Sequence, residues 1–423
     1  MYTPFKSPLK EQYPQRLHIR VIHSKGLLNC ICLLEYVFKR GSIWIYASIL
    51  HFINDFIITL IPAIILVLRS EFSLNYADQG LLMTIPTLIA IIPQTFTGHL
   101  ADRVHVSRII LVCTMLLGFG TALMGLSQNF NQLLISACIV GLGASFTHPT
   151  IYSITSSHYA GLEVRYLSFV SAAGDVSLPM VFAVTEALTE MVGWRIIMLC
   201  YGLTTISMSI ILYKASLNIK ITRKVGGRNI SNYKLIKQLI KPLIVLGIIT
   251  SCYRIILTFT TTYLNHIGLS IEWANYIFAV ILSISIMGPV MTGILLKGGG
   301  GMRIVALEMT IISTLSIAVT LSSNPTLTPI ILVPIWILIL SVWPPIYSTI
   351  SRSLPQEHMG LTYGASLTFT WAFGSIWPYI AGIIADTYSI NMIYLLVAAL
   401  SIVAVAIAIT YGERFSSETP PTQ

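Results

Sequence analysis

The sequence predicts an all-α polytopic membrane protein whose twelve transmembrane helices form two pseudo-symmetric six-helix bundles. Three observations support this prediction: the composition, the length of the apolar blocks, and a repeat between the two halves of the chain. Of the 423 residues, 55% are hydrophobic and only 10% are charged, whereas about a quarter of the residues in a typical soluble domain are charged. Lipid rather than water is therefore the expected solvent for most of the surface.

Apolar blocks of about 20 residues or more recur along the chain and set the number of helices. At ~1.5 Å per residue, such a block crosses the ~30 Å hydrocarbon layer of a bilayer. The first six spans are expected at residues 43–68, 77–100, 107–126, 131–157, 166–190 and 194–215. The second six are expected at residues 240–265, 273–297, 303–322, 327–353, 360–385 and 390–411.

The segments outside these blocks divide the chain into domains. Residues 27–38 are mostly apolar but too few to span, so we expect an interfacial helix there rather than a thirteenth span. The expected domains are a basic cytoplasmic tail at 1–42, a six-helix bundle at 43–215, a cytoplasmic linker at 216–239, a second bundle at 240–411 and a cytoplasmic tail at 412–423.

The basic residues predict the orientation of the chain. With both termini in the cytoplasm, 22 of the 25 lysines and arginines fall on cytoplasmic segments, as the positive-inside rule requires. The net charge of +9 is thus a signal of topology. It does not indicate nucleic-acid binding, because the basic residues form no recognition motif. We expect a monomeric multi-pass protein of the plasma membrane, in contact with the lipid bilayer.

Catalytic and cofactor-binding patterns are absent from the sequence. The glycine run 298–301 lacks the lysine and hydroxyl residue of a phosphate-binding loop. The six cysteines form no CxxC pair and no cluster with histidine. We therefore expect neither an enzyme nor a bound cofactor or metal.

Two short motifs repeat between the halves at the same offset of 195 residues. Pro149-Thr-Ile-Tyr-Ser153 in the fourth span recurs as Pro344-Pro-Ile-Tyr-Ser348 in the tenth. Thr97-Gly-His-Leu100 in the second span recurs as Thr292-Gly-Ile-Leu295 in the eighth. In both cases the second copy lies six spans after the first. This indicates a duplicated six-helix unit, the parallel repeat found in transporters.

The motif Gly98-His-Leu-Ala-Asp102-Arg103, followed by Arg108, resembles the signature between the second and third spans of the major facilitator superfamily. The resemblance implies the major facilitator fold over residues 43–411. It also implies a cytoplasmic gate, in which the acid and the arginines latch one side of the protein shut. The alternative is a solvated, positively charged loop. The motif departs from the family pattern at His105, where a glycine is common.

Three further motifs resemble fosmidomycin-resistance-type efflux proteins within that superfamily: His51-Phe-Ile-Asn54-Asp55, Ser70-Glu-Phe-Ser-Leu74 and His148-Pro149. Asp175 departs from this pattern, because an uncharged residue is more usual there. The resemblance therefore implies efflux, but not the substrate specificity of those proteins.

Ionisable side chains within spans are costly and mark a cavity or a partner. His51 and Asp55 are four residues apart and so share one helix face. Arg254 lies in the middle of the seventh span, at the position equivalent to Asp55 in the first. We hypothesise that Asp55 carries protons, with an affinity that depends on how near Arg254 lies. The alternative is a permanent buried pair that locks the two halves together.

Other polar residues in the spans extend the candidate site. Asp175 is a second candidate proton carrier, with a hydrogen-bonded packing residue beside Gly174 as the alternative. Glu186 is expected to be solvated, because it lies near the outer end of its span. His148 precedes Pro149, which removes a backbone donor and bends the fourth span, and its alternative is a histidine bonded to a neighbouring helix. The candidate residues for proton coupling are Asp55, Asp175 and His51, and those for solute binding are Arg254, His148, Asn54, Thr258, Trp343 and Tyr347.

These features predict a secondary active transporter that moves a small organic solute by alternating access. Protons are the expected coupling ion, in efflux antiport or in symport. The alternatives are an uncoupled facilitator and a non-transporting membrane receptor. Arg254 favours an organic anion as the solute, whereas the efflux resemblance favours an amphiphilic, drug-like solute.

Overall fold

A computed structural model of the chain describes residues 43–95, 104–159, 162–217, 219, 233–295, 301–352 and 368–416. All of them belong to one compact unit, and the regular elements within these ranges are helices. The predicted tail at 1–42 and most of the predicted linker lie outside the described residues, so the domain boundaries stay a prediction.

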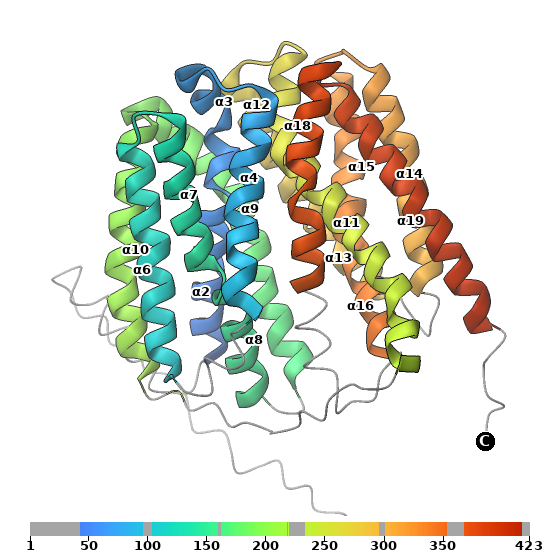
Figure 1. The fold of residues 1–423 in the computed structure, drawn as a ribbon, viewed down its shortest axis with the longest axis horizontal. Coiled ribbons are helices and arrows are strands. Elements are labelled where there is room, and N and C mark those ends of the chain that lie inside the picture. The colour runs from blue at the N-terminus through green and yellow to red at the C-terminus, as the bar shows by residue number, and fades with distance from the viewer. Residues whose placement is uncertain are drawn as a thin grey trace, which may run out of the picture. The chain divides into compact units, whose positions relative to one another are not determined.

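The first half of the chain contains six spans, two of which are divided (Figure 1). The helices are α2 (Ile43–Ile58), α3 (Leu60–Phe72), α4 (Tyr76–Thr95), α6 (Val106–Leu126), α7 (Phe130–Ala144), α8 (Thr147–His158), α9 (Glu163–Val192) and α10 (Trp194–Ser216). Those of the second half are α11 (Tyr233–His266), α12 (Ile271–Ser285), α13 (Met287–Leu295), α14 (Gly301–Leu321), α15 (Leu327–Ser341), α16 (Trp343–Arg352), α18 (Trp377–Thr387) and α19 (Met392–Ser416).

Eleven helical stretches among the described residues are long and apolar enough to cross a membrane. They coincide with eleven of the twelve spans expected from the sequence. The remaining expected span, 360–385, is described from residue 368 onward and is helical to Thr387, apart from a turn at Ile376. The prediction of an all-α, twelve-helix membrane fold is confirmed.

Five of the described spans are each interrupted by a turn shortly before a proline. A proline has no N–H to donate to the carbonyl four residues earlier, which opens the helix just before it. The predicted bend of the fourth span is confirmed by the break between α7 and α8. Four of the breaks lie three residues before the proline: Thr59 before Pro62, Phe146 before Pro149, Ile286 before Pro289 and Val342 before Pro345. The fifth, at Ile376, lies two residues before Pro378.

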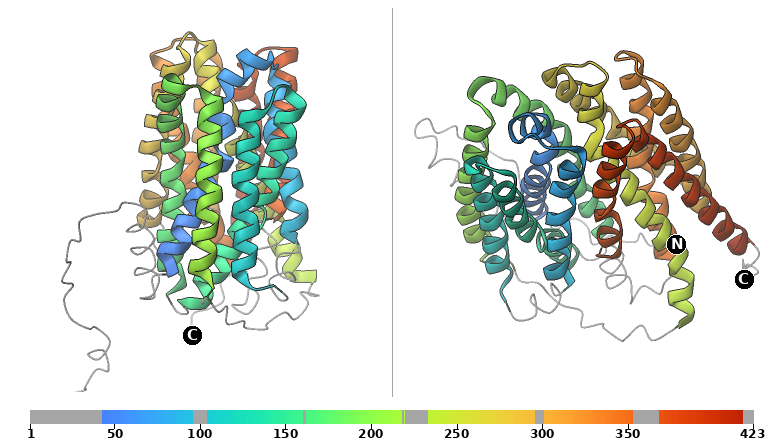
Figure 2. Two further views of the ribbon diagram at one scale, coloured as in Figure 1. Left: turned by 90° about the vertical axis from the view of Figure 1, so that its left-hand side faces the viewer. Right: turned by 45° about the horizontal axis from the view of Figure 1, so that its top comes forward.

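The described connections between spans gather at one end of the helices, which we term the short-loop end (Figures 1 and 2). Caps stabilise several helix termini there. The side chain of Asn129 accepts a hydrogen bond from the Gln132 amide at the start of α7, and Ser270 does the same for Trp273 in α12. The short-loop end comprises the connections at residues 73–75, 127–129, 193, 267–270, 322–326 and 388–391.

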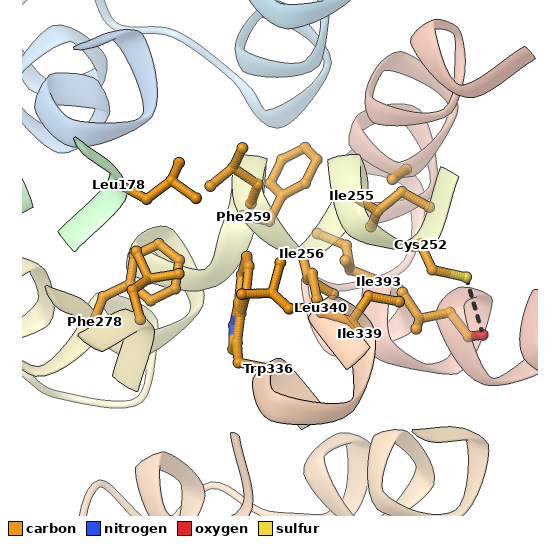
Figure 3. Close-up of a cluster of buried hydrophobic side chains, with 14 of the residues drawn as sticks. Leu178, Cys252, Ile255, Ile256, Phe259, Phe278, Trp336, Ile339, Leu340 and Ile393 are labelled. Carbon is orange, nitrogen blue, oxygen red and sulfur yellow. Dashed lines mark hydrogen bonds between the residues drawn. The ribbon is translucent and has the colours of Figure 1, made fainter. Parts of the chain in front are cut away.

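Helix α11 forms the buried centre of the second half. Its residues Cys252, Ile256 and Phe259 contribute to a cluster with side chains of α12, α15 and α19 (Figure 3). The Trp336 ring of α15 lies 5.0 Å from Phe278 of α12 and is fully buried. This packing holds α11, and with it Arg254, in a fixed position.

The two halves meet closely through α4 and α18, near the short-loop end. A methyl group added at Gly80 would lie 2.3 Å from the carbonyl oxygen of Pro378, and one at Gly382 would lie 2.3 Å from that of Tyr76. Only glycine permits this approach. The carboxylate of Asp386 accepts hydrogen bonds from the Tyr76 and Ala77 amides, at 2.9 and 2.8 Å. It thereby satisfies the free N–H groups of the first turn of α4.

Candidate functional site

Asp55 lies in the last turn of α2, in contact with two histidines. Its Oδ2 atom is 3.2 Å from Nε2 of His51, one helical turn earlier, and its Oδ1 atom is 3.5 Å from Nε2 of His148 on α8. The two imidazole rings are perpendicular, with centroids 5.0 Å apart. We term these three residues the Asp55 cluster. The shared face predicted for His51 and Asp55 is confirmed, and the break before α8 brings His148 against it.

The hydrogen bonds of His51 require a proton between its ring and Asp55. The His51 Nδ1 atom lies 2.8 Å from the carbonyl oxygen of Val170, and a carbonyl oxygen only accepts, so Nδ1–H is the donor. In a neutral ring with that tautomer, Nε2 is a bare acceptor. Facing an ionised carboxylate, it would repel Oδ2. The contact is attractive only when a proton sits on His51 Nε2 or on Asp55 Oδ2.

Asn54 joins the other side of the cluster. Its amide nitrogen donates to Asp55 Oδ1 at 2.9 Å and lies 3.3 Å from His148 Nε2. The residue is fully buried. One amide group thus positions both the carboxylate and the second imidazole. Asn54 is also a predicted solute-binding residue, and in this structure its amide contacts the Asp55 cluster.

The ligand types of the Asp55 cluster are also those of a transition-metal site. One ligand atom from each of His51, Asp55 and His148 lies within 4.8 Å of the others. The amide hydrogens of Asn54, however, are directed at Asp55 Oδ1 and His148 Nε2, where they would oppose a cation. This arrangement favours a shared proton over a metal ion.

Gly174 of α9 allows that helix to approach the cluster. A methyl group there would lie 2.6 Å from Asp55 Oδ2 and 2.9 Å from the His51 ring. The next residue, Asp175, is close enough to interact electrostatically with both Asp55 and His51. The two carboxyl groups therefore influence each other, and the role of Asp175 as a second proton carrier stays a prediction.

The Asp55 cluster is partly accessible to water, although it lies in the middle of the spans. The side chain of Asp55 keeps 21% of its surface accessible and that of His148 keeps 15%. Protonation and solute contact are therefore both feasible at this depth.

Arg254 lies on α11 and contacts the other half of the protein. Its Nη1 donates to the hydroxyl of Thr87 on α4 at 3.0 Å. Its guanidinium carbon lies 5.0 Å from the centre of the Trp371 ring, within cation–π range. That ring also makes an edge contact with His148, at 5.5 Å.

Arg254 and Asp55 are not paired in this structure. The Arg254 guanidinium donates to Thr87, and the Asp55 carboxylate contacts the rings of His51 and His148. A chain of contacts connects the two residues. Arg254 contacts Trp371, Trp371 contacts His148, and His148 contacts Asp55. The alternative of a permanent pair that locks the halves therefore finds no support here.

The remaining predicted solute-binding residues occupy different surroundings. Thr258 is buried, and its hydroxyl donates to the Arg254 carbonyl of its own helix. Trp343 and Tyr347 stack with ring centres 6.1 Å apart, and Trp343 makes an edge contact with Tyr253. The Thr258 hydroxyl is therefore bonded to the backbone of its own helix. Trp343 and Tyr347 are half-buried in the first half of α16.

Most residues of the predicted gate cannot be placed. Gly98, Asp102 and Arg103 lie outside the described residues. Arg108 is exposed in the first turn of α6. His105, the departure from the family pattern, caps that helix by accepting a hydrogen bond from the Ser107 amide.

The prediction that Glu186 is solvated is wrong. Glu186 is only 4% exposed, and it accepts a 2.5 Å hydrogen bond from the side chain of Asn275 on α12. Glu190, one turn later, accepts from Tyr276. Glu186 does lie near the end of its span, as the sequence predicts. The sequence could not show that Asn275, from the other half of the protein, covers it.

Comparison with known proteins establishes the family. A sequence model of the Major Facilitator Superfamily matches residues 47–378, which is most of the chain, and the protein belongs to this family of membrane transporters. It is 24% identical over 367 residues to the fosmidomycin resistance protein of Escherichia coli (strain K12), covering 84% of this chain and 88% of that protein.

Solved structures share the fold. A bacterial homologue of the human lysosomal transporter Spinster, in an inward-facing and unoccupied conformation, superposes with a TM-score of 0.76 at 14% identity, covering 90% of this chain and 99% of that one. The nucleoside transporter NupG superposes with a TM-score of 0.68 at 12% identity, covering 88% of this chain and 99% of that one. The fold and the family define a membrane transporter rather than an enzyme.

Proposed function

We propose that this transporter moves a small organic solute by alternating access, with protons as the coupling ion. The observation that carries the proposal is the His51–Asp55 contact, whose geometry requires a bound proton. Proton coupling requires a buried carboxylate that binds a proton in one conformation of the bundle and releases it in another. Asp175 is the second carboxyl group of this proton site.

The solute is proposed to bind between Arg254 and the neighbouring aromatic rings. Trp371, His148 and the Trp343–Tyr347 pair present flat ring surfaces, and the guanidinium supplies a positive charge. Because Thr87 is its only hydrogen-bond acceptor among the described side chains, Arg254 keeps donors free for an anionic group. The combination supports an organic anion with an apolar or planar body.

The conformation described here is proposed to be the inward-facing one. The α4–α18 contact at Asp386 and the α9–α12 contact at Glu186 both lie toward the short-loop end. With both termini in the cytoplasm of a monomeric plasma-membrane protein, that end faces outward. The segment from Gly98 to Arg108 would then form the latch that closes the opposite, cytoplasmic side.

Efflux is the proposed direction, because the curated relative is a resistance protein. The test is transport into proteoliposomes with an imposed pH gradient, with radiolabelled fosmidomycin as the first probe and organic anions as further ones. We expect the gradient to drive accumulation of one of these probes above its external concentration. Equilibration without accumulation would instead support the uncoupled facilitator.

Arg254→Ala is expected to remove the response of the purified protein to its solute. In a thermal-shift screen of organic anions, a ligand should stabilise the wild type and leave the variant unchanged, because the charge that holds the anion is gone. Thr87→Val serves as the matched control, since it removes the partner of Arg254 but keeps its charge. A ligand that stabilises Arg254→Ala as much as the wild type would contradict this site.

A further inference from the structure

A cavity of about 590 Å³ lies at the short-loop end, away from the central residues used in the proposed mechanism. Its walls come from the end of α3, the start of α4, the end of α11 and the start of α12, and they include Arg69, Tyr76, Thr262 and His266. We term it the outer cavity. Its volume falls in the range of about 300–1,000 Å³ that is typical of sites for small organic molecules.

Arg69 supplies a positive charge to the wall of the outer cavity. Its guanidinium carbon lies 4.1 Å from the centre of the Tyr76 ring, in a cation–π contact. Its Nη1 donates to Oε1 of Gln79 at 3.1 Å, which is the side-chain hydrogen bond that it makes among the described residues. A guanidinium carries five N–H groups. The ring and Gln79 therefore fix its orientation, while most of its donors stay available to an anion.

Two acidic residues near Arg69 are bonded elsewhere. Asp386 accepts hydrogen bonds from the first two amides of α4, and Asp78 accepts one from the Asn75 amide at 3.2 Å. Both carboxylates are thus directed at backbone N–H groups, and neither lines the outer cavity. The ion pairs among the described residues do not include Arg69. Its charge is therefore not neutralised by a direct contact.

The rest of the lining combines apolar and polar groups. Leu66, Leu74 and Ile271 offer apolar surface, and the ring of Tyr76 offers a flat one. His266 and Ser70 add a ring nitrogen and a hydroxyl that can donate hydrogen bonds. An arginine beside an aromatic ring and aliphatic side chains suits an organic anion with an apolar or planar body. This is the class of solute proposed for Arg254.

The outer cavity also lies along the helix that carries Arg254. Asn265 lines the cavity eleven residues after Arg254, which is about three turns of α11 and roughly 16 Å along its axis, so both residues share one face. Between them, the Gln79 amide donates to the Thr258 carbonyl at 2.6 Å and to the Thr262 hydroxyl at 2.9 Å. This contact between the two halves separates the outer cavity from the central site.

We propose that the outer cavity is a second binding site for the anionic solute, with Arg69 as the residue that binds its charged group. The proposal rests on the solute class proposed above. In the direction of efflux, a solute that has left Arg254 passes the contact at Gln79 and is held at Arg69 before it leaves the protein. The same site binds organic anions that arrive from outside.

The test is protection of an engineered cysteine in the purified full-length protein. Ser70→Cys places a thiol in the lining of the outer cavity, and Arg254→Ala in the same chain removes the central site. Benzoate is the probe, and neutral benzamide is the matched control with the same planar body. We expect benzoate to slow the reaction of the thiol with a maleimide several-fold and saturably, and benzamide to leave it unchanged. The chain without Ser70→Cys gives the background from the native cysteines.

Two further variants assign the protection to Arg69. Arg69→Gln should lose it, because the amide keeps polar atoms but not the charge. Arg165→Gln removes an exposed arginine at the opposite end of α9 and should keep it. Absence of protection by benzoate, or undiminished protection in Arg69→Gln, would overturn the proposal. If Arg69→Gln does not fold, equal protection by benzoate and benzamide would overturn it. Because Arg254 is absent throughout, these results do not depend on the central site or on proton coupling.

Discussion

Asp55→Asn is expected to reduce pH-driven solute accumulation to the level of liposomes without protein. Asparagine keeps the size of the side chain and an acceptor oxygen for Asn54, but cannot share a proton with His51. Exchange of labelled for unlabelled solute, which needs no net proton movement, should continue. The two assays on one preparation separate loss of coupling from loss of binding.

Two controls make the Asp55→Asn result specific. Asp78→Asn removes an exposed carboxylate at the start of α4 and should leave accumulation unchanged. The Tm of Asp55→Asn should stay close to that of the wild type. If the variant unfolds instead, Asp55 is a structural residue, and if it accumulates solute as the wild type does, another group carries the proton.

Gly80→Ala is expected to shift the conformational equilibrium away from the state described here. The added methyl group would lie 2.3 Å from the Pro378 carbonyl oxygen, and 2.8 Å from the next Cα atom on α18. Because backbone cannot rotate away as a side chain does, α4 and α18 must separate at the short-loop end. Overpacking of this kind costs about 1–3 kcal/mol, which corresponds to a shift of roughly 5- to 150-fold between two states.

Labelling of an engineered cysteine measures this shift. Thr262→Cys places a thiol on α11 where the wild-type hydroxyl contacts Gln79 of α4 and the residue is 4% exposed. Its reaction with a membrane-impermeant maleimide should be faster in the Gly80→Ala background. Gly293→Ala is the matched control, because no atom of the described residues lies within 4 Å of the added methyl group. Equal rates in all three backgrounds would show that the α4–α18 contact does not set the conformation.

The sequence predicted the fold because the signals for it are local. Apolar length gives the spans, and prolines mark the five helix breaks among the described spans. The spacing of His51 and Asp55 placed them on one face, since four residues make about one helical turn. These features depend only on residues that are close in the sequence, so they do not depend on how the helices pack together.

The partners of Arg254 could not be predicted in this way. The equivalent positions of Arg254 and Asp55 in the two halves suggested a direct pair, whereas the structure interposes Trp371 and His148. Which residue of α4 faces α11 depends on how the helices are rotated about their axes, and no pattern within one span fixes that rotation. Thr87 therefore carried no signal in the sequence.

Buried carboxylates in the spans show the same limit. Glu186 was expected to be solvated, because depth in the membrane was the only available criterion, and Asn275 from the other half covers it. Glu308 did not stand out, because its partners Thr292 and Ser341 come from two other spans. Side chains that act through contacts between helices become visible only in three dimensions.

The central claim, that Asp55 couples solute movement to proton movement, is tested most directly by solute-driven proton flux. A pH-sensitive dye inside proteoliposomes would report the lumenal pH while a solute gradient is imposed at zero membrane potential. We predict that solute movement changes the lumenal pH for the wild type and leaves it constant for Asp55→Asn. Solute movement through the wild type without any change of lumenal pH would contradict the claim.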